Sequence, residues 1–145
     1  MRRTSRMTLF ALLILVTMIA FCVALAREIE SDFGRVRVRV VRFPGELGVE
    51  LVGKLYVPKS ASEENPRPAV LALHGFQNDK ETMDAYAIEL SRRGFVVLAL
   101  DQYGHGSSDG RLALTEADPT LGGNAAYQYL KTLPYVDRAN LGVMG

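Results

Sequence analysis

Three patterns of apolar and polar positions follow one another along this chain. Residues 7–26 form a run of twenty positions without a charged side chain. Residues 35–40 then alternate strictly between arginine and valine, which predicts a strand with one solvated face and one buried face. From Ala69 onward the apolar runs become short and continuous, as is typical of strands that are covered on both faces. The patterns therefore predict an apolar leader followed by two different kinds of β-structure.

The first β-region is predicted to be an antiparallel hairpin. Pro44-Gly45 marks a turn after the alternating strand, and Val49–Val57 has the composition of a second strand. A polar loop bounded by prolines, Lys59–Pro68, separates this hairpin from the rest of the chain. We expect the hairpin to lead into the buried part of the same sheet.

The second β-region predicts a strand, a helix and a strand. The two predicted strands are the apolar runs Ala69–Leu73 and Phe95–Leu100. Between them, Asn78 is expected to cap a helix, with Glu81 completing a capping box, and Gly94 is expected to end it. The apolar face of this helix is expected to consist of Met83, Tyr86, Ala87 and Leu90. Such a unit makes the two strands parallel neighbours joined by a right-handed connection.

The remaining residues predict one more helix and one more strand. The helix is expected over residues 124–133, with Ala126, Leu130 and Leu133 on its apolar edge. The strand is expected over Leu141–Met144, in the same sheet. The chain is therefore assigned to the α/β class, with a mostly parallel sheet that begins with an antiparallel hairpin.

The apolar leader has two possible fates. Its length matches the roughly 20 residues of a transmembrane helix better than the roughly 7–15 of a signal-peptide core. Arg2, Arg3 and Arg6 would then stay in the cytoplasm, and the rest of the chain would lie on the other side of the membrane. Ala24-Leu25-Ala26 is also a plausible cleavage site, which would release the chain after Ala26. Residues 1–26 are thus expected to be a signal anchor, or alternatively a signal peptide.

Charge and cysteine content exclude several functions. After residue 26 the chain carries fourteen basic and sixteen acidic side chains, a balance that gives no sign of nucleic-acid binding. The single cysteine, Cys22, lies inside the apolar leader. The remainder of the chain therefore has no thiol for catalysis and no intrachain disulfide.

Two polar segments follow the two buried strands directly. His74-Gly75-Phe76 comes after the first, and Asp101 to Ser108 comes after the second. Because the carboxyl ends of parallel strands meet at one edge of a sheet, both segments are expected to border the same crevice. His74, His105 and Asp101 could approach a common metal ion there, but they lack the spacing of a metal motif. We expect no metal and no cofactor, and we interpret Asp101 and His105 as structural.

One segment imitates a catalytic motif. Gly106-Ser107-Ser108-Asp109-Gly110 fits the pattern Gly-x-Ser-x-Gly. A catalytic serine of this kind sits on a tight turn directly between a strand and a helix. Ser108 lies eight residues after Leu100, and residues 111–114 show no helix start. We therefore reject Ser108 as a nucleophile.

The two loop segments and the tail, in this order, resemble the N-terminal half of α/β-hydrolases. The tail runs from Tyr135 to Gly145, and the likeness covers about residues 36–145. It is similar to the segment before the nucleophile in serine aminopeptidases, monoacylglycerol lipases and dienelactone hydrolases. The resemblance implies that residues 27–145 are the N-terminal part of such a domain.

The resemblance also implies roles for individual residues. The N–H of Phe76 would be one donor of an oxyanion hole, and His74 and Gly75 would support its loop. Gly145 would be the first glycine of the Gly-x-Ser-x-Gly turn that carries the nucleophile. The nucleophile, the acid and the catalytic histidine would then lie outside this chain. The 145 residues are expected to be inactive, and residues 27–145 expressed alone are expected to be poorly soluble.

The resemblance makes the complete protein a membrane-associated serine hydrolase of ester bonds, or less readily of amide or thioester bonds. Its partners would be a small-molecule ester, lipid or peptide substrate and, through residues 7–26, the membrane. A non-catalytic binding or surface protein of the same fold is an alternative. So is a dehalogenase-like enzyme with a different nucleophile. Epoxide hydrolases usually carry His-Gly-x-Pro, and Gln77 counts against them.

Overall fold

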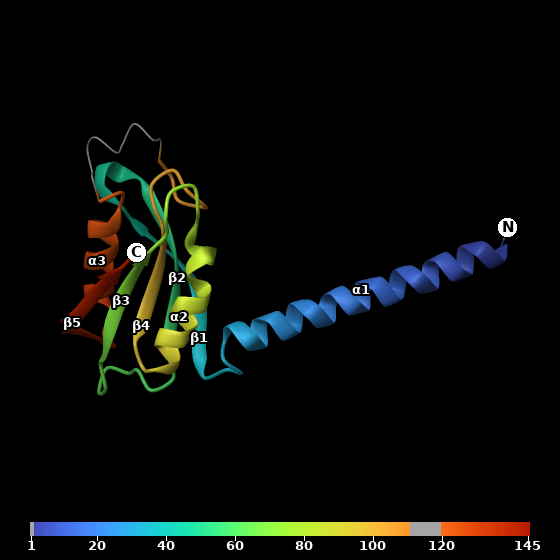
Figure 1. Ribbon diagram of the computed structural model, residues 1–145, viewed down its shortest axis with the longest axis horizontal. Helices are drawn as coiled ribbons and strands as arrows, with labels where there is room; N and C mark the ends of the chain where they lie inside the picture. Colours follow the sequence, from blue (N-terminus) through green and yellow to red (C-terminus); the bar gives the residue numbers. More distant parts are fainter. Residues whose placement is uncertain (1, 111–119) are drawn as a thin grey trace.

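Five strands form one mixed sheet in residues 2–110 and 120–145, which the computed structural model describes (Figure 1). The strands are β1 (Val36–Pro44), β2 (Glu50–Pro58), β3 (Arg67–Leu73), β4 (Val96–Asp101) and β5 (Val136–Met144). Their order across the sheet is β1-β2-β4-β3-β5. The β1–β2 and β2–β4 pairs are antiparallel, whereas β3 runs parallel to both β4 and β5. The predicted hairpin and the predicted parallel neighbours are confirmed.

The register of the parallel strands aligns their carboxyl ends. Leu73 at the end of β3 pairs with Leu100 of β4, and Ala72 pairs with Met144 of β5. The segments that follow these strands must therefore start at the same edge of the sheet. This edge is where open α/β sheets bind their ligands.

Helices cover the two faces of the sheet (Figure 1). α2 (Asp84–Arg92) packs on one face, where Met83 and Ala87 meet Tyr56, Val97 and their neighbours. α3 (Gly123–Thr132) packs on the other. The second face holds the larger apolar layer, which includes Leu55, Leu71, Leu98, Ala126 and Leu130. Strands covered on both faces explain the continuous apolar runs in the sequence.

The helix between β3 and β4 starts differently from the sequence-based prediction. A short 3-10 turn, η2 (Lys80–Met83), precedes α2, and its cap is Asp79, whose side chain accepts a hydrogen bond from the Glu81 N–H at 3.0 Å. Asn78 does not cap this helix, because its own N–H closes the preceding turn on the Gly75 carbonyl at 3.2 Å. The 3-10 turn therefore begins one residue later than the predicted helix, and the α-helix itself begins only at Asp84.

The prediction of the apolar face of α2 is also wrong at one residue. Tyr86 is 60% exposed, and Ser91 takes a buried position on α2 instead. The small Ser91 side chain lets the helix approach β2, where its hydroxyl lies 3.5 Å from the Tyr56 carbonyl oxygen. Gly94 ends the helix with φ +95°, as its position predicts.

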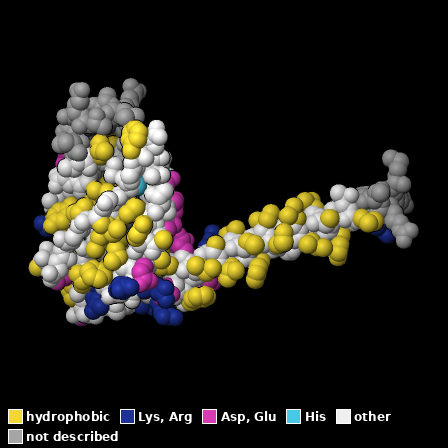
Figure 2. Space-filling model, in the orientation of Figure 1, with side chains coloured by type: hydrophobic (Ala, Val, Ile, Leu, Met, Phe, Trp, Pro, Cys, Tyr) yellow, Lys and Arg dark blue, Asp and Glu magenta, His cyan; other side chains and the backbone are white. Residues whose placement is uncertain are grey.

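α1 (Arg2–Glu30) projects from the sheet as a single helix (Figure 1). Exposed apolar side chains occupy most positions from Met7 to Leu25, so they surround the helix rather than forming one stripe. Figure 2 shows those on the visible face. Residues 6–30 are long and apolar enough to cross a membrane. A further 3-10 turn, η1 (Glu46–Gly48), connects β1 to β2.

Gly53 in β2 tests the close packing of the sheet. A Cβ at this position would lie 2.6 Å from Leu98 Cδ1 and 3.0 Å from the Ala99 carbonyl oxygen. We expect Gly53→Ala to lower the free energy of unfolding of the full chain by about 1–3 kcal/mol. Urea titration in detergent, followed by tyrosine fluorescence, measures this change.

The matched control is Gly142→Ala in β5, where a Cβ would meet no atom within 4 Å. It should change the free energy of unfolding by no more than about 0.5 kcal/mol. Equal losses in the two variants would contradict the packing argument, because both substitutions place the same methyl group in a strand.

Candidate functional site

The carboxyl edge of the parallel strands brings together three sequence segments. The loop from His74 follows β3, the loop from Gln102 follows β4, and Gly145 follows β5. Gly145 lies directly beside β3, since a Cβ on it would be 3.3 Å from both the Cβ and the carbonyl oxygen of Leu73. His74, Gly75 and Gly145, which are far apart in the sequence, therefore meet at one edge.

His74 joins the first two loops. Its ring is buried, and Nδ1 lies 2.8 Å from the Gly75 carbonyl oxygen. Nε2 accepts a hydrogen bond from the Gln102 N–H at 3.2 Å. These partners fix the tautomer with hydrogen on Nδ1, because a carbonyl can only accept and an amide N–H can only donate. With both nitrogens engaged, His74 supports the loop and is not available as a base or a metal ligand.

The next four residues form a tight turn that leaves an amide group without a hydrogen-bond partner among the described residues. The Asn78 N–H donates to the Gly75 carbonyl, and Gln77 at the third position has φ +60°. A non-glycine residue in this left-handed region costs about 1–3 kcal/mol, and such positions are often found at ligand sites. The Phe76 side chain is 80% exposed. Its N–H donates to no group in the described part of the chain. This N–H group can therefore donate a hydrogen bond to a ligand oxygen.

Asp101 is the central anchor of this edge. Its carboxylate is fully buried and accepts hydrogen bonds of 2.8 Å from the Lys80 N–H, the Lys80 ammonium and the Ser107 N–H. Gly106 is required beside it, because a Cβ there would lie 2.2–2.3 Å from the carboxylate atoms. Burial alone would raise the pKa of Asp101, but the bond from Lys80 and the two backbone donors bring it below its ordinary value. The interpretation of Asp101 as structural agrees with these contacts.

Ser108 has a similar structural role. Its hydroxyl donates to the Asp101 carbonyl at 2.6 Å and accepts from the Val52 N–H at 2.8 Å. The hydroxyl therefore ties the loop to β2 and β4 rather than facing the crevice. Residues 111–114, on which part of the argument against Ser108 rested, lie outside the described residues.

His105 also forms a hydrogen bond within its own loop. Its Nδ1 donates to the Tyr103 carbonyl at 2.9 Å, and its ring centroid lies 5.1 Å from that of His74. The two histidines are thus close, as the sequence suggested. Because His74 and Asp101 are engaged elsewhere, the three side chains do not offer a set of free metal ligands.

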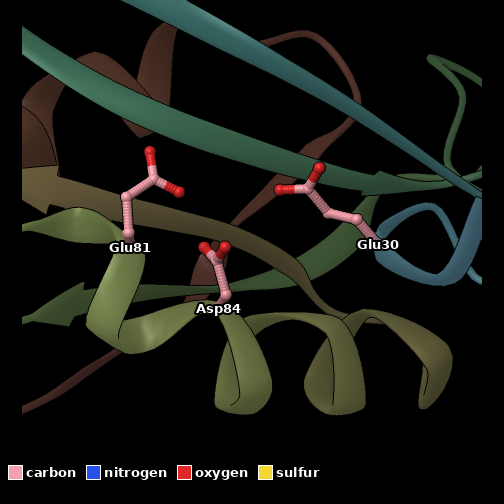
Figure 3. Close-up of side chains that lie close together, drawn as sticks. All are labelled: Glu30, Glu81 and Asp84. Carbon is pink, nitrogen blue, oxygen red and sulfur yellow. The ribbon is translucent and has the colours of Figure 1, made fainter. Parts of the chain in front are cut away.

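A second polar cluster lies away from this edge, between α1 and α2, and sequence reasoning missed it. Three carboxylates converge in Figure 3: Glu30 at the end of α1, Glu81 in η2 and Asp84 at the start of α2. The Lys54 ammonium contacts all three, at 2.6 Å for Glu81 and 2.9 Å for Asp84, and the Tyr56 hydroxyl donates to Asp84. We call these five residues the Lys54 cluster.

The Lys54 cluster is an ion-pair network with its own internal cation. Burial alone would lower the pKa of Lys54, but the hydrogen bonds to the three acids raise it above its ordinary value. Burial raises the pKa of Asp84, against the hydrogen bonds from Tyr56 and Lys54. The signal in the sequence was Lys54 itself, a lysine with apolar residues on both sides of it in a predicted strand. Such a lysine must find partners when it is buried.

Comparison with known proteins adds a family to this geometry. The family model described as serine aminopeptidase, S33, matches residues 64–126. An uncharacterized protein of Pseudomonas aeruginosa is 33% identical over 128 residues, which cover 83% of this chain and 34% of the relative. The uncharacterized protein YcjY of Escherichia coli is 34% identical over 101 residues, covering 67% of this chain and 33% of the relative. The chain spans about a third of the length of these relatives.

Solved structures share the same fold. A hypothetical protein from Pseudomonas aeruginosa has a TM-score of 0.68 at 33% identity, and the match covers 77% of this chain and 35% of that one. Est1E from Butyrivibrio proteoclasticus, solved with ferulic acid bound, has a TM-score of 0.63 at 28% identity, covering 72% and 41%. Acetyl xylan esterase 1 from a Thermoanaerobacterium species has a TM-score of 0.63 at 22% identity, covering 77% and 40%, and supports the fold alone.

Asp101 gives a test of how this edge is held together. Because its pKa is lower in the folded than in the unfolded chain, the unfolded chain binds more protons in acid. The stability that this group contributes is present above its ordinary pKa of 3.8 and is lost as the pH falls through the folded value. We expect Asp101→Asn to lower the free energy of unfolding at pH 7 by about 3 kcal/mol. It removes the closer of the two acids that buried Lys80 contacts, at 2.8 Å against 3.6 Å for Glu81.

The same variant should show a shallower loss of stability than the parent chain as the pH falls from about 5 to below 3.8, where the folded carboxylate is still ionised and the unfolded one is not. Urea titrations across this range measure both effects. The control is Asp137→Asn, which makes the same change on an exposed carboxylate and should leave the neutral-pH urea midpoint close to the parent value. An Asp101→Asn variant as stable as this control would show that Asp101 does not anchor the edge.

Proposed function

Because this chain belongs to the α/β-hydrolase superfamily, we propose that it supplies the oxyanion-binding part of a serine hydrolase that acts on ester bonds. The observation that carries the proposal is the open N–H of Phe76 on the loop that starts beside Gly145. In this family the nucleophile stands two residues after the glycine at the Gly145 position. The amide and the nucleophile would then face the same crevice.

The proposed reaction is acyl transfer through a serine ester. The serine oxygen attacks the substrate carbonyl while a histidine takes its proton, and the carbonyl oxygen becomes an oxyanion. The Phe76 N–H would donate to this oxyanion together with the N–H of the residue after the nucleophile. The serine, the acid and the histidine would come from residues after Gly145.

The support of the loop explains why a backbone amide can serve here. Oxyanion donors stabilise the transition state best when they are already in place before the charge develops. His74 fixes the start of the turn through Gly75 and Gln102, and Lys80 fixes its end on Asp101. Phe76 lies between these two fixed points, so its N–H would need little reorganisation. His74 and Gly75 are thus proposed as supporting residues.

The proposed substrates are carboxylic esters. Est1E, which shares 28% identity with this chain, was solved with ferulic acid bound. Amides and thioesters pass through the same type of oxyanion and remain second choices. No cofactor has a role in this mechanism.

The proposed location is the membrane. Residues 7–26 of α1 would span it, with the basic N-terminus in the cytoplasm and residues 27–145 on the other side as the N-terminal part of the hydrolase domain. Cleavage after Ala26 would instead release the domain. The uncleaved span is favoured by the length of the apolar run, which exceeds that of a signal-peptide core.

Phe76→Pro tests the role of the amide directly. Proline removes the N–H and fits the second position of a tight turn, so the loop can keep its shape. In a chain that continues beyond Gly145, we expect this variant to lower kcat for a p-nitrophenyl ester by about 10²–10³-fold. KM should change little, because the oxyanion exists in the transition state and not in the bound ester.

Phe76→Ala is the matched control, because it removes the exposed ring and keeps the N–H. Its kcat should stay within about threefold of the parent value, as expected for a surface substitution. A Phe76→Pro variant with unchanged kcat would contradict the proposed oxyanion hole. Equal losses in both variants would assign the effect to the ring instead of the amide.

A further inference from the structure

A cationic hollow lies at the end of the sheet opposite the candidate site. It has a volume of about 530 Å³ and is bordered by the segment that follows α1, the end of β2, the start of β3 and the end of α2. Arg67, the first residue of β3, lines it, whereas His74 follows the last residue of the same strand. The basic side chains that line it are Arg35, Lys59, Arg67, Arg92 and Arg93. These five residues define the cationic hollow.

The positive charge of this hollow is only partly neutralised. Among the described residues that line it, Asp32 is the one acid, and it pairs with Arg92 at 3.3 Å and with Arg35 at 3.6 Å. Glu89, which does not line the hollow, pairs with Arg93 at 2.7 Å and with Arg92 at 3.6 Å. Lys59 is exposed and pairs with no acid in the described part of the chain. The hollow therefore keeps an excess of cationic groups that can bind an anion.

One of these arginines is built into the wall of the hollow. The Arg67 Nε donates to the Gly94 carbonyl at 3.2 Å, and its guanidinium lies over Gly94. A Cβ on Gly94 would come within 2.4 Å of Arg67 Nη2, so only glycine leaves room for this arrangement. The planar guanidinium group suits a phosphate, which it can bind through two parallel hydrogen bonds.

The hollow lies next to the point where α1 meets the domain. In Figure 2 the dark blue side chains gather beside this point. The contacts agree: Asp32, which pairs with Arg92, lies two residues after the end of α1, and the Lys59 N–H donates to the Arg35 carbonyl at 3.0 Å. The basic residues are thus held at the level of the α1 terminus.

The junction between α1 and the sheet is closed by its own hydrogen bonds. The Phe33 N–H donates to the Glu28 carbonyl at 2.7 Å, and the Val36 N–H donates to the Ser31 carbonyl at 2.9 Å. The Lys54 cluster adds the ion pair of Glu30 with β2. The hollow therefore has a defined height above the apolar part of α1.

That height corresponds to the headgroup layer. From Ala26, the last residue of the apolar run, to Glu30 is four residues, or about 6 Å of helix rise. The polar layer on each side of a bilayer is about 5–8 Å thick. If residues 7–26 span the apolar core, the end of α1 and the hollow beside it lie among the lipid headgroups.

We infer that the cationic hollow docks the domain on anionic phospholipid headgroups of the bilayer that α1 spans. This inference rests on the proposed membrane anchor. Headgroup phosphates would bind to the three exposed cations of the hollow, Arg35, Lys59 and Arg93, beside the fixed guanidinium group of Arg67. Docking would hold the strands parallel to the plane of the bilayer, because they run across the axis of α1 in Figure 1. The edge with Phe76 would then open sideways, away from the docked end.

A fluorescent label at Ser60, which lines the hollow, reports on the contact. The full chain with Cys22→Ser and Ser60→Cys is labelled and reconstituted in phosphatidylcholine vesicles with or without phosphatidylglycerol. A quencher attached to the headgroups measures how close the label lies to the membrane surface. We expect phosphatidylglycerol to increase quenching at least twofold, and about 1 M NaCl to remove the increase because it shortens the Debye length to about 3 Å.

A pair of triple variants provides the control. The triple variant Arg35→Gln, Lys59→Gln and Arg93→Gln should lose the phosphatidylglycerol-dependent increase. The triple variant Arg42→Gln, Lys131→Gln and Arg138→Gln removes the same charge elsewhere and should keep it. Urea titration checks that both variants fold. An increase that survives in the first variant, or no increase in the parent chain, overturns the inference.

Carbonate extraction of the same vesicles separates this inference from the proposed anchor. A chain that resists extraction but shows no lipid-dependent quenching disproves docking and leaves the anchor in place. A chain that is extracted disproves the anchor, and the docking inference falls with it. Both proposals are supported if the parent chain resists extraction and if, of the two triple variants, only the first loses the phosphatidylglycerol-dependent increase in quenching.

Discussion

The buried carboxylate of Asp101 is the interaction on which the carboxyl edge of the sheet depends. It receives Lys80 from the segment that follows the His74 loop and Ser107 from the segment that follows β4. A buried charge is costly unless its partners are complete, and here each oxygen has at least one close donor. One side chain therefore sets the position of both loops, and the open amide of Phe76 lies in the first of them.

The sequence was sufficient to predict the sheet because burial and conformation agreed at each strand. Continuous apolar runs predicted β3 and β4 within one residue or two, and Gly94 marked the end of the helix between them. The Asn78 cap was predicted wrongly because Asn78 suits both a helix cap and a tight turn. In the structure it closes the turn, where its N–H donates to the Gly75 carbonyl. Propensity alone cannot decide between two such motifs when both satisfy a backbone group.

The polar clusters were harder to predict because their members come from distant segments. The Lys54 cluster joins residues from α1, β2, η2 and α2, so its geometry exists only in the folded chain. The left-handed φ of Gln77 has no sequence signal either, because glycine or asparagine would be expected at that position of the turn. For the candidate site, the order of motifs predicted which loops meet, and the structure added that Gly145 lies against Leu73.

We propose that the edge with Phe76 and Gly145 forms part of a serine hydrolase site. The most direct measurement is fluorophosphonate labelling of a chain that continues beyond Gly145, followed by mass spectrometry of the labelled peptide. We expect a single modified serine, two residues after Gly145, and no modification of Ser108. A label on Ser108, or an aspartate at the predicted position and no label at all, would contradict it.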